Sequence, residues 1–341
     1  MAGRRPGHLR TGARRRDGGR RRLRAARSDR CALPHRHRPR RQPDHLARPG
    51  AGTGPDRPGR GRAGDPRRRV AVPVPRTGGR AGPAATGPRG PAHRPAQALP
   101  ARHRREVGAA EVAETVAAQA AAGNGWVKLV GDWIERGVGD LAPAWDADTM
   151  TAAVAAAHAA GVRAAVHTFS ESAVEIMVRA GVDSVEHGTG LSLDLIDLMA
   201  RQGTALVPTM INIRTFGHIA EQARPKFPGY ADHMLALRDR FPEVVRAAHE
   251  AGVPIYVGTD AGGGIDHGLA AEEMLLLHEQ AGMSAPDVLA AASWRAREWL
   301  GFPGLVEGGL ADLVVYPEDP RRDLRVVRTP SRIVLRGRVV R

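Results

Sequence analysis

Residues 148–187 read DTMTAAVAAAHAAGVRAAVHTFSESAVEIMVRAGVDSVEH, and the pattern in this segment indicates the fold class. It holds two copies of one unit, in which an amphipathic helical stretch is followed by a glycine and then by a short apolar strand that ends in histidine. In the first copy, a helix is expected over 148–160 and a strand over 163–167, which ends at His167. In the second copy, the helix is expected over 172–180 and the strand over 183–187, which ends at His187. The periodicity therefore predicts helices that alternate with strands.

The same unit recurs along the rest of the chain from residue 106 onward. Three further copies have expected helices at 109–122, 192–202 and 244–251, followed by expected strands at 126–130, 205–208 and 254–260. The glycine between helix and strand falls where a helix ends in a left-handed residue, which glycine adopts without strain. These glycines are Gly123, Gly161, Gly181, Gly203 and Gly252.

Strands that alternate with helices of this length pair in parallel through right-handed crossovers. An open doubly wound sheet and a closed (β/α)8 barrel both fit this pattern. The barrel is favoured because polar residues recur at the carboxyl ends of several strands, where that fold places its active site. The run Gly262-Gly263-Gly264 lacks both the lysine of a nucleotide-binding loop and the spacing of a dinucleotide-binding loop. Five strands are recognisable, so the other three would have to come from the first 105 residues.

The first 105 residues differ sharply in composition from the remainder. The formal net charge of the 341-residue chain is +15, yet residues 1–105 carry 30 Arg, five Asp and no Lys or Glu, which gives +25. The remainder therefore carries about −10 and has an ordinary globular composition. With no Ile, Phe, Tyr or Trp, residues 1–105 cannot bury enough apolar surface to offset the entropy of ordering, so we expect them to be disordered.

Three interpretations of this Arg/Pro/Gly-rich segment remain open. It could be a basic tail that binds nucleic acid or another anionic polymer, although it has no aromatic residue to stack on a base. It could be a solvated low-complexity extension. The interpretation that we favour is a frameshift product, because residues with GC-rich codons dominate and common surface residues are missing. A nucleic-acid partner is therefore not expected.

Cysteine usage and hydropathy suggest a cytoplasmic protein. Cys31 is the single cysteine, so no intramolecular disulfide can form. No apolar run long enough for a targeting peptide follows the basic start, and no stretch approaches the length of a membrane span. We therefore expect no membrane association.

Four polar residues stand in or at the end of expected strands: Lys128, His167, His187 and Asp260. Taken singly, each has a structural explanation, such as a hydrogen-bonded histidine or a helix-capping aspartate. Together, a barrel would turn all four toward one pocket. Two neutral imidazoles and a carboxylate are a common ligand set for zinc or a similar divalent cation.

These motifs resemble the amidohydrolase superfamily, specifically its imidazolonepropionase-like and Xaa-Pro dipeptidase-like members. The resemblance rests on WVKL at 126–129, VH at 166–167, VEHGT at 185–189 and VGTDAG at 257–262. The runs GLVEGGLADLVVY at 304–316 and RIVLRGRVV at 332–340 match as well. The resemblance implies an incomplete TIM-type (β/α)8 barrel at 106–303, with strands four to eight of that barrel, and C-terminal strands of a small β-sandwich at 304–341.

The resemblance also implies a role for each site residue. Lys128 would be carboxylated by CO2 to a carbamate that bridges two divalent metal ions, with zinc expected. His167 and His187 would bind the more exposed metal, and Asp260 would bind the buried metal and act as the catalytic proton shuttle. His267, in the loop that follows, is expected at the surface. The implied activity is hydrolysis of an amide, cyclic amide or peptide C–N bond in a small-molecule or dipeptide-like substrate.

The sequence departs from the family pattern at the first barrel strand, which should end in a His-x-His pair. The single match is His35-Arg36-His37, which no apolar strand precedes. Without that pair, we expect the chain to be inactive or to bind fewer metals. The alternatives are an ester, lactone or phosphoester hydrolase with the same site, and a non-catalytic barrel fragment with an anion-binding tail. A homo-oligomer is compatible with the sequence but is not indicated by it.

Overall fold

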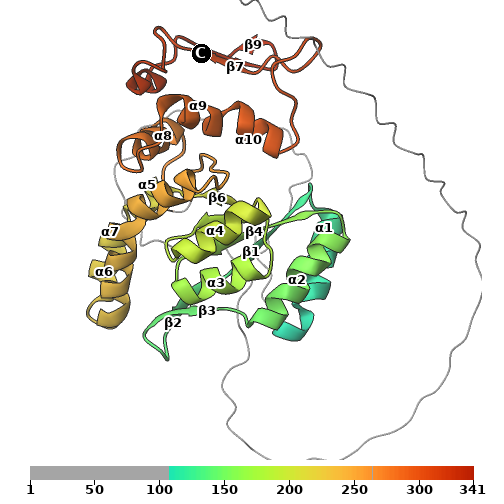
Figure 1. Cartoon of the computed structure of the whole chain (residues 1–341), viewed down its shortest axis with the longest axis vertical. Helices are drawn as coiled ribbons and strands as arrows, with labels where there is room; N and C mark the ends of the chain where they lie inside the picture. The colour runs from blue at the N-terminus through green and yellow to red at the C-terminus, as the bar shows by residue number, and fades with distance from the viewer. Residues whose placement is uncertain (1–106, 263) are drawn as a thin grey trace, which may run out of the picture. The chain divides into compact units, whose positions relative to one another are not determined.

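The computed structural model describes residues 107–262 and 264–341. The expectations for residues 1–105, including Cys31 and the pair His35 and His37, lie outside the described residues. Four strands form a parallel sheet in the order β1-β4-β5-β6 (Figure 1). They are β1 (Trp126–Val130), β4 (Arg163–Thr168), β5 (Ser184–His187) and β6 (Ala205–Val207). Each matches an expected strand, which confirms the α/β fold with a partial barrel.

The fifth expected strand, at 254–260, is only partly formed. Ile255 makes one parallel bridge with Leu206 of β6. The backbone N–H of Leu206 donates to the carbonyl of Pro254 at 2.8 Å, and that of Tyr256 donates back to Leu206 at 3.0 Å. The segment therefore lies beside β6, where the next barrel strand belongs, but leaves the ladder before it reaches Asp260.

The expected helices form with small shifts of their ends. The structure contains α1 (Val112–Ala122), preceded by the 3-10 turn η2 (Ala109–Glu111), then α2 (Ala147–Ala159), α3 (Glu171–Arg179) and α4 (Leu193–Gln202). Ser170 and Ser192 cap α3 and α4, because each side chain accepts a hydrogen bond from an N–H of the first turn. Four expected glycines have positive φ: Gly161, Gly181, Gly203 and Gly252. The expectation for Gly123 was wrong: its φ is −87°, and Gly125 takes the positive φ of 99° instead.

Several elements were not expected from the sequence. The hairpin of β2 (Asp132–Glu135) and β3 (Asp140–Pro143) follows β1. Helix α7 (Pro228–Glu250) begins well before residue 244 and accommodates Pro242. The additional helices are α5 (Met210–Ile213), α6 (Phe216–Ala223), α8 (Ala270–Glu279), α9 (Ala285–Ala292) and α10 (Trp294–Trp299).

Helix α7 is attached to the hairpin and to α3 through His233. Its two ring nitrogens face carboxylates, with Nδ1 at 2.9 Å from Asp140 of β3 and Nε2 at 3.0 Å from Glu171 of α3, and a protonated ring donates to both. Burial alone would lower the pKa of His233, but the hydrogen bonds to the two carboxylates outweigh it and raise the pKa above 6.5. Arg240, further along α7, also contacts Glu171 and the carbonyl of Thr189.

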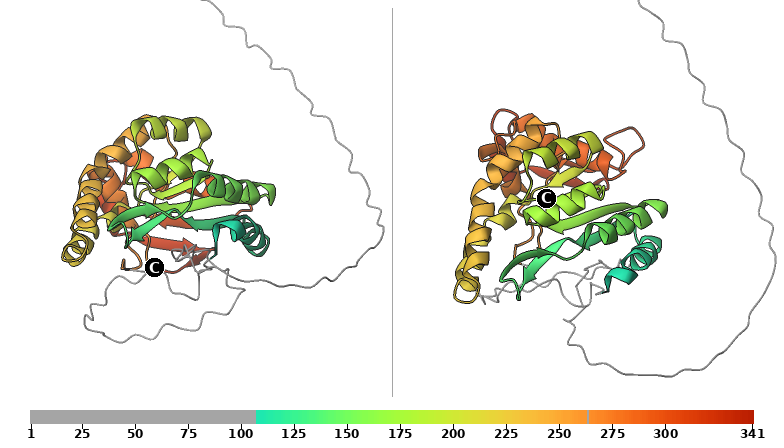
Figure 2. Two further views of the ribbon diagram at one scale, coloured as in Figure 1. Left: turned by 90° about the horizontal axis from the view of Figure 1, so that it is seen from below. Right: turned by 60° about the horizontal axis from the view of Figure 1, so that its bottom comes forward.

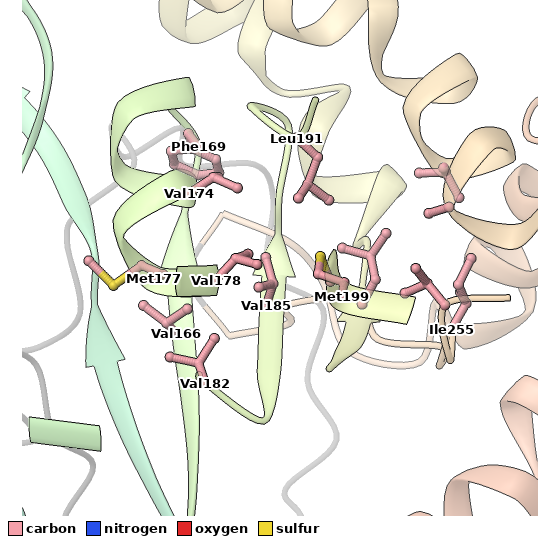
Figure 3. Packing of buried hydrophobic residues seen from close by; sticks show 14 of the residues in the cluster. Val166, Phe169, Val174, Met177, Val178, Val182, Val185, Leu191, Met199 and Ile255 are labelled. Atoms are coloured by element: carbon pink, nitrogen blue, oxygen red, sulfur yellow. The ribbon is translucent and has the colours of Figure 1, made fainter. Parts of the chain in front are cut away.

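The hydrophobic core lies between the sheet and the helices that cover one of its faces. In the edge-on view of Figure 2, α3 and α4 run along a single face of the strands. Val166 of β4 and Val185 of β5 pack there against Met177, Val178 and Met199 of these helices (Figure 3). Because side chains alternate along a strand, the residue that follows each of these valines, His167 in β4 and Glu186 in β5, points to the opposite face of the sheet.

The C-terminal residues form a separate antiparallel sheet in the order β7-β8-β9. It consists of β7 (Leu313–Val315), β8 (Arg332–Leu335) and β9 (Arg338–Val339), with the 3-10 turn η3 (Leu324–Arg328) between β7 and β8. Both expected C-terminal strand regions, 304–316 and 332–340, therefore contain strands. Among the described residues, no helix has the length and apolar character that crossing a membrane requires.

Candidate metal centre

Lys128 lies in the middle of β1 on the face opposite the helices. Its neighbours Val127 and Leu129 are buried in the core, so alternation directs the lysine to the other side of the sheet. Its ammonium group reaches across β4 and forms an ion pair with Glu186 of β5. Burial lowers the pKa of Lys128 to about 7, and the negative charge of Asp260 opposes that shift.

His167 lies near the carboxyl end of β4 on the same face. The register pairs it with Glu186 on β5 and with Val130 on β1. The ring of Phe169 contacts the imidazole edge-on, with 4.5 Å between centroids, and the centroid of the Trp133 ring lies 5.6 Å from that of the imidazole. Burial, and secondarily the charge of Lys128, lower the pKa of His167 to about 3, so the imidazole is neutral at pH 7.

His187 ends β5 and reaches His167 because of an unusual backbone conformation. Strand alternation would place it on the face opposite Glu186, but its φ is 68°, in the left-handed region. Its Nε2 lies 2.9 Å from Nδ1 of His167, and its Nδ1 lies 2.7 Å from Oγ1 of Thr209. Burial and the neighbouring charges lower the pKa of His187 as well, so the two rings form a neutral pair.

The histidine pair has an unsatisfied hydrogen-bonding capacity. Two neutral imidazoles that face each other share one proton between their facing nitrogens. Both nitrogens of His187 are occupied, by His167 and by Thr209. The Nε2 atom of His167 is buried and has no hydrogen-bond partner among the described residues. A buried orphan nitrogen is costly, and a neutral imidazole with a free nitrogen is a common metal ligand.

Asp260 follows the irregular segment 254–257 and also has a left-handed backbone, with a φ of 56°. Its Oδ2 accepts a hydrogen bond from the carboxamide nitrogen of Asn212 at 2.7 Å. Partial burial raises its pKa, whereas the charge of Lys128 acts in the opposite direction. Asp260 and Lys128 thus influence each other's pKa without a direct ion pair. His267 is exposed in the following loop.

The four expected residues are therefore brought to one side of the sheet, but they do not all touch. His167 contacts His187, Lys128 contacts Glu186, and Asp260 contacts Asn212. Within the described ranges, no cluster of three or more His, Cys, Asp or Glu residues is arranged to hold a metal ion. The two imidazoles are donors of the type that divalent cations take, but among the described residues no third ligand is gathered with them, and Nε2 of His187 would have to leave Nδ1 of His167 to bind a cation.

Sequence reasoning overlooked three partners of the expected residues: Glu186, Thr209 and Asn212. Glu186 precedes His187 directly and could have been noted as a charged residue in a strand that is otherwise apolar. Thr209 stands two residues after the end of β6, one register position beyond that of His187 on β5. Asn212 is reached only through the fold of the segment after β6, and no sequence signal marks it.

Backbone strain marks the same region independently. Among the described residues, four non-glycine residues have positive φ: His187, Thr209, Asp260 and Arg336. His187 is the last residue of β5, Thr209 follows β6, and Asp260 follows the segment that lies beside β6. Such conformations cost about 1–3 kcal/mol each and persist where the surrounding structure enforces them, which is typical of functional sites.

Solved structures with a similar fold include two enzymes of one kind. The fold is similar to a crystal structure of a Xaa-Pro dipeptidase with bound methionine, at 27% identity and a TM-score of 0.59, over 68% of this chain and 58% of that one. It is equally similar to a putative prolidase from Bifidobacterium longum, at 28% identity and a TM-score of 0.59, over 68% and 59% of the two chains.

Sequence relatives cover a similar region. An uncharacterised protein of Mycobacterium tuberculosis is 52% identical over 223 residues, which are 65% of this chain and 60% of the relative. An ochratoxinase of Aspergillus niger is 27% identical over 172 residues, which are 49% of this chain and 35% of that enzyme. The chain thus spans about 60% of the length of the mycobacterial relative. The sequence profile of the amidohydrolase family matches residues 80–340, and the chain belongs to this family.

Proposed function

We propose that this protein hydrolyses an amide or peptide C–N bond in a small dipeptide-like substrate, at a site built around His167 and His187. The observation that carries the proposal is the neutral histidine pair with its orphan Nε2 atom, at the carboxyl ends of the strands of an amidohydrolase barrel. In barrels of this kind, the active site lies at that end. The similarity to a Xaa-Pro dipeptidase and to a putative prolidase supports a dipeptide with a C-terminal proline as the first substrate to test.

The residues that would hold a divalent cation, with zinc as the first candidate, are His167 and His187, with Asp260 and Lys128 beside them. A cation bound there would lower the pKa of a bound water and polarise the substrate carbonyl. Thr209 fixes the ring of His187 through Nδ1, as the outer partners of metal-binding histidines commonly do. The low pKa of both imidazoles keeps them unprotonated and able to act as ligands at neutral pH.

Asp260 is the proposed proton shuttle. Its carboxylate takes the proton of the attacking water and passes it to the leaving nitrogen, as a general base and then as a general acid. A pKa that is raised above the usual value brings the carboxylate closer to the range in which it can do both. The hydrogen bond from Asn212 occupies Oδ2 and orients the group.

Lys128 is the proposed site of a CO2-derived carbamate, which the family resemblance implies. In the present arrangement its ammonium group is held by Glu186. A carbamate is an anion, so its formation would require this ion pair to open and Glu186 to turn away or to become protonated. A carbamate carbon in a 13C spectrum of the protein in 13C-bicarbonate, absent in Lys128→Arg, would be the direct evidence.

The experiment that tests the function uses the purified full chain. We expect bound zinc and release of free proline from Ala-Pro, measured by chromatography. Asp260→Asn should abolish the release of proline and leave the circular dichroism spectrum unchanged. Full activity of Asp260→Asn would contradict the proposed proton shuttle. A chain that neither binds zinc nor cleaves Ala-Pro would instead agree with the expectation of an inactive chain without the His-x-His pair.

A further inference from the structure

Glu273 is a buried carboxylate that lies outside the candidate metal centre. It stands in the first turn of α8 and is completely inaccessible to solvent. Its two oxygens accept hydrogen bonds from the backbone N–H groups of Met210 and Ile211, both at 2.8 Å. Helix α5, to which these groups belong, lies beside α8 (Figure 1). A buried carboxylate is unfavourable unless its oxygens are hydrogen-bonded, and here both are.

Helix α5 is a single turn whose N-terminus is capped in an unusual way. Thr209 occupies the N-cap position, where the hydroxyl of a threonine ordinarily accepts a hydrogen bond from an N–H of the first turn. In this protein the Thr209 hydroxyl makes no such bond and instead contacts Nδ1 of His187. Glu273 supplies the missing acceptors from another helix, which leaves the threonine hydroxyl available for the histidine.

The other end of the same turn is directed at Asp260. The carboxamide nitrogen of Asn212 donates to Asp260, and Oγ1 of Thr215 lies 2.7 Å from the carbonyl of Asn212 and 3.3 Å from its Oδ1. The contact between the Thr215 hydroxyl and Oδ1 holds the amide with its nitrogen toward Asp260. Residues 209–212, which we call the clamp turn, therefore contact a proposed metal ligand at one end and the proposed proton shuttle at the other.

We propose that Glu273 is a positioning residue, which anchors the clamp turn and thereby fixes the ring of His187 and the carboxylate of Asp260. This inference rests on the proposed function for the roles of those two residues. The anchoring is needed because Thr209 has a φ of 48°, a strained value for a β-branched residue that persists only when its surroundings enforce it. Without the two backbone hydrogen bonds to Glu273, the turn can relax and release its contacts at both ends.

The experiment compares Glu273→Gln with Glu272→Gln in the full chain. The glutamine introduced in the first variant can accept only one of the two N–H groups and turns its own N–H2 toward the other. Glu272 is the matched control, because it precedes Glu273 in α8, undergoes the same change to glutamine and, among the described residues, forms its ion pair with Arg328. The first measurement is the ring 15N spectrum of His187 without added metal, assigned with His187→Gln. The second is titration with Co2+, followed by its visible absorption.

We expect Glu273→Gln to change the His187 ring resonances and to weaken Co2+ binding at least tenfold, as loss of an outer partner of a metal ligand typically does. Glu272→Gln should match the wild type in both measurements. If Glu273→Gln also matches the wild type in both, the inference is wrong. A merely structural role would lower the melting temperature without moving the His187 resonances of the folded protein, and that result would overturn it too.

If Glu273→Gln does not fold, Glu273→Asp tests the anchor, because it keeps the carboxylate but shortens its reach to the N–H groups of Met210 and Ile211; unchanged His187 resonances in this variant would overturn the inference. A further pair of variants tests the contact between Thr209 and His187. Thr209→Ser keeps the hydroxyl that faces His187, and Thr209→Ala removes it. The inference requires that the alanine variant changes the His187 resonances and that the serine variant restores them; identical spectra for both would overturn it. Should the wild type bind no Co2+, the proposed function fails, and the ring spectra alone still decide whether Glu273 and the clamp turn position His187.

Discussion

Replacement of Asp132 by asparagine tests how the loop after β4 is held beneath His167. Asp132 of β2 is completely buried, and its carboxylate accepts N–H groups of Phe169 at 2.9 Å and Ser170 at 2.6 Å. Burial raises its pKa from 3.8 to about 6, although these hydrogen bonds act in the opposite direction. We expect the stability of Asp132→Asn, relative to the wild type, to depend strongly on pH.

The magnitude follows from the shift in pKa. Because the pKa of Asp132 is higher in the folded state, the unfolded chain loses the proton first as the pH rises, and the group destabilises the fold progressively between about pH 4 and pH 6. A rise in pKa from 3.8 to about 6 corresponds to about 3 kcal/mol. Asparagine does not titrate, and its amide oxygen can take the place of Oδ2, which accepts both N–H groups, so its own effect on stability is the same at every pH. The stability of the variant relative to the wild type should therefore rise by about 3 kcal/mol between pH 4 and pH 7.

The assay is urea unfolding of both proteins at half-unit steps from pH 4 to pH 7.5, followed by tryptophan fluorescence. Asp148→Asn, at the exposed start of α2, controls for the chemical change itself. As the pH rises from about 4 to about 6, the free energy of unfolding of Asp132→Asn should rise by about 3 kcal/mol relative to that of the wild type. A difference that stays constant over this range would show that the carboxyl group of Asp132 titrates alike in the folded and unfolded states, which contradicts a raised pKa in the fold.

Three further substitutions test other parts of the structure. Gly190→Ala should strongly lower the melting temperature, because its new methyl group would overlap the backbone carbonyl of Ser170, so that backbone must move; differential scanning fluorimetry checks this. Trp145→Phe should cost about 2–4 kcal/mol in urea unfolding, since the buried indole donates to the carbonyl of Val130 at 2.9 Å and its loss leaves a cavity as well. His233→Gln should lower the melting temperature more at pH 6 than at pH 9, because a raised pKa stabilises the fold below about pH 6.5 and that stabilisation disappears as the pH rises through the folded value; equal losses at both pH values would contradict it.

The sequence allowed prediction of the elements whose signals are local. The strands that end at His167 and His187 could be located from their apolar runs, and the left-handed conformations of Gly161 and Gly203 from their position between helix and strand. The prediction for Gly123 was wrong because the sequence offers a second glycine, Gly125, directly before β1, and the positive φ falls there instead. In each correct case, the determining interactions lie within a few residues of the position predicted.

The contacts that shape the site could not be predicted, because they join residues far apart in the chain. Glu273 contacts Met210 over a separation of 63 residues, and Asp132 contacts Phe169 over 37. Neither the glutamate nor the aspartate is distinguishable in the sequence from the exposed acidic residues around it. Only the fold reveals that each is buried. Likewise, the positive φ of His187 reverses the face that strand alternation assigns to it, and no local signal announces that reversal.

Asp132 and Glu273 show a common way of holding the carboxyl ends of the strands. Each is a buried carboxylate from a neighbouring element, and each binds two consecutive backbone N–H groups of a segment that follows a strand, β4 in one case and β6 in the other. Burial raises the pKa of the first to about 6 and of the second to about 7, so ionisation of either at neutral pH costs stability. An apolar contact would hold the same segments without that cost, but it would leave four backbone N–H groups unsatisfied and would not fix their direction. The stability that the protein gives up at these two positions is therefore best explained by the need to fix the segments that carry Phe169 against His167 and Thr209 against His187.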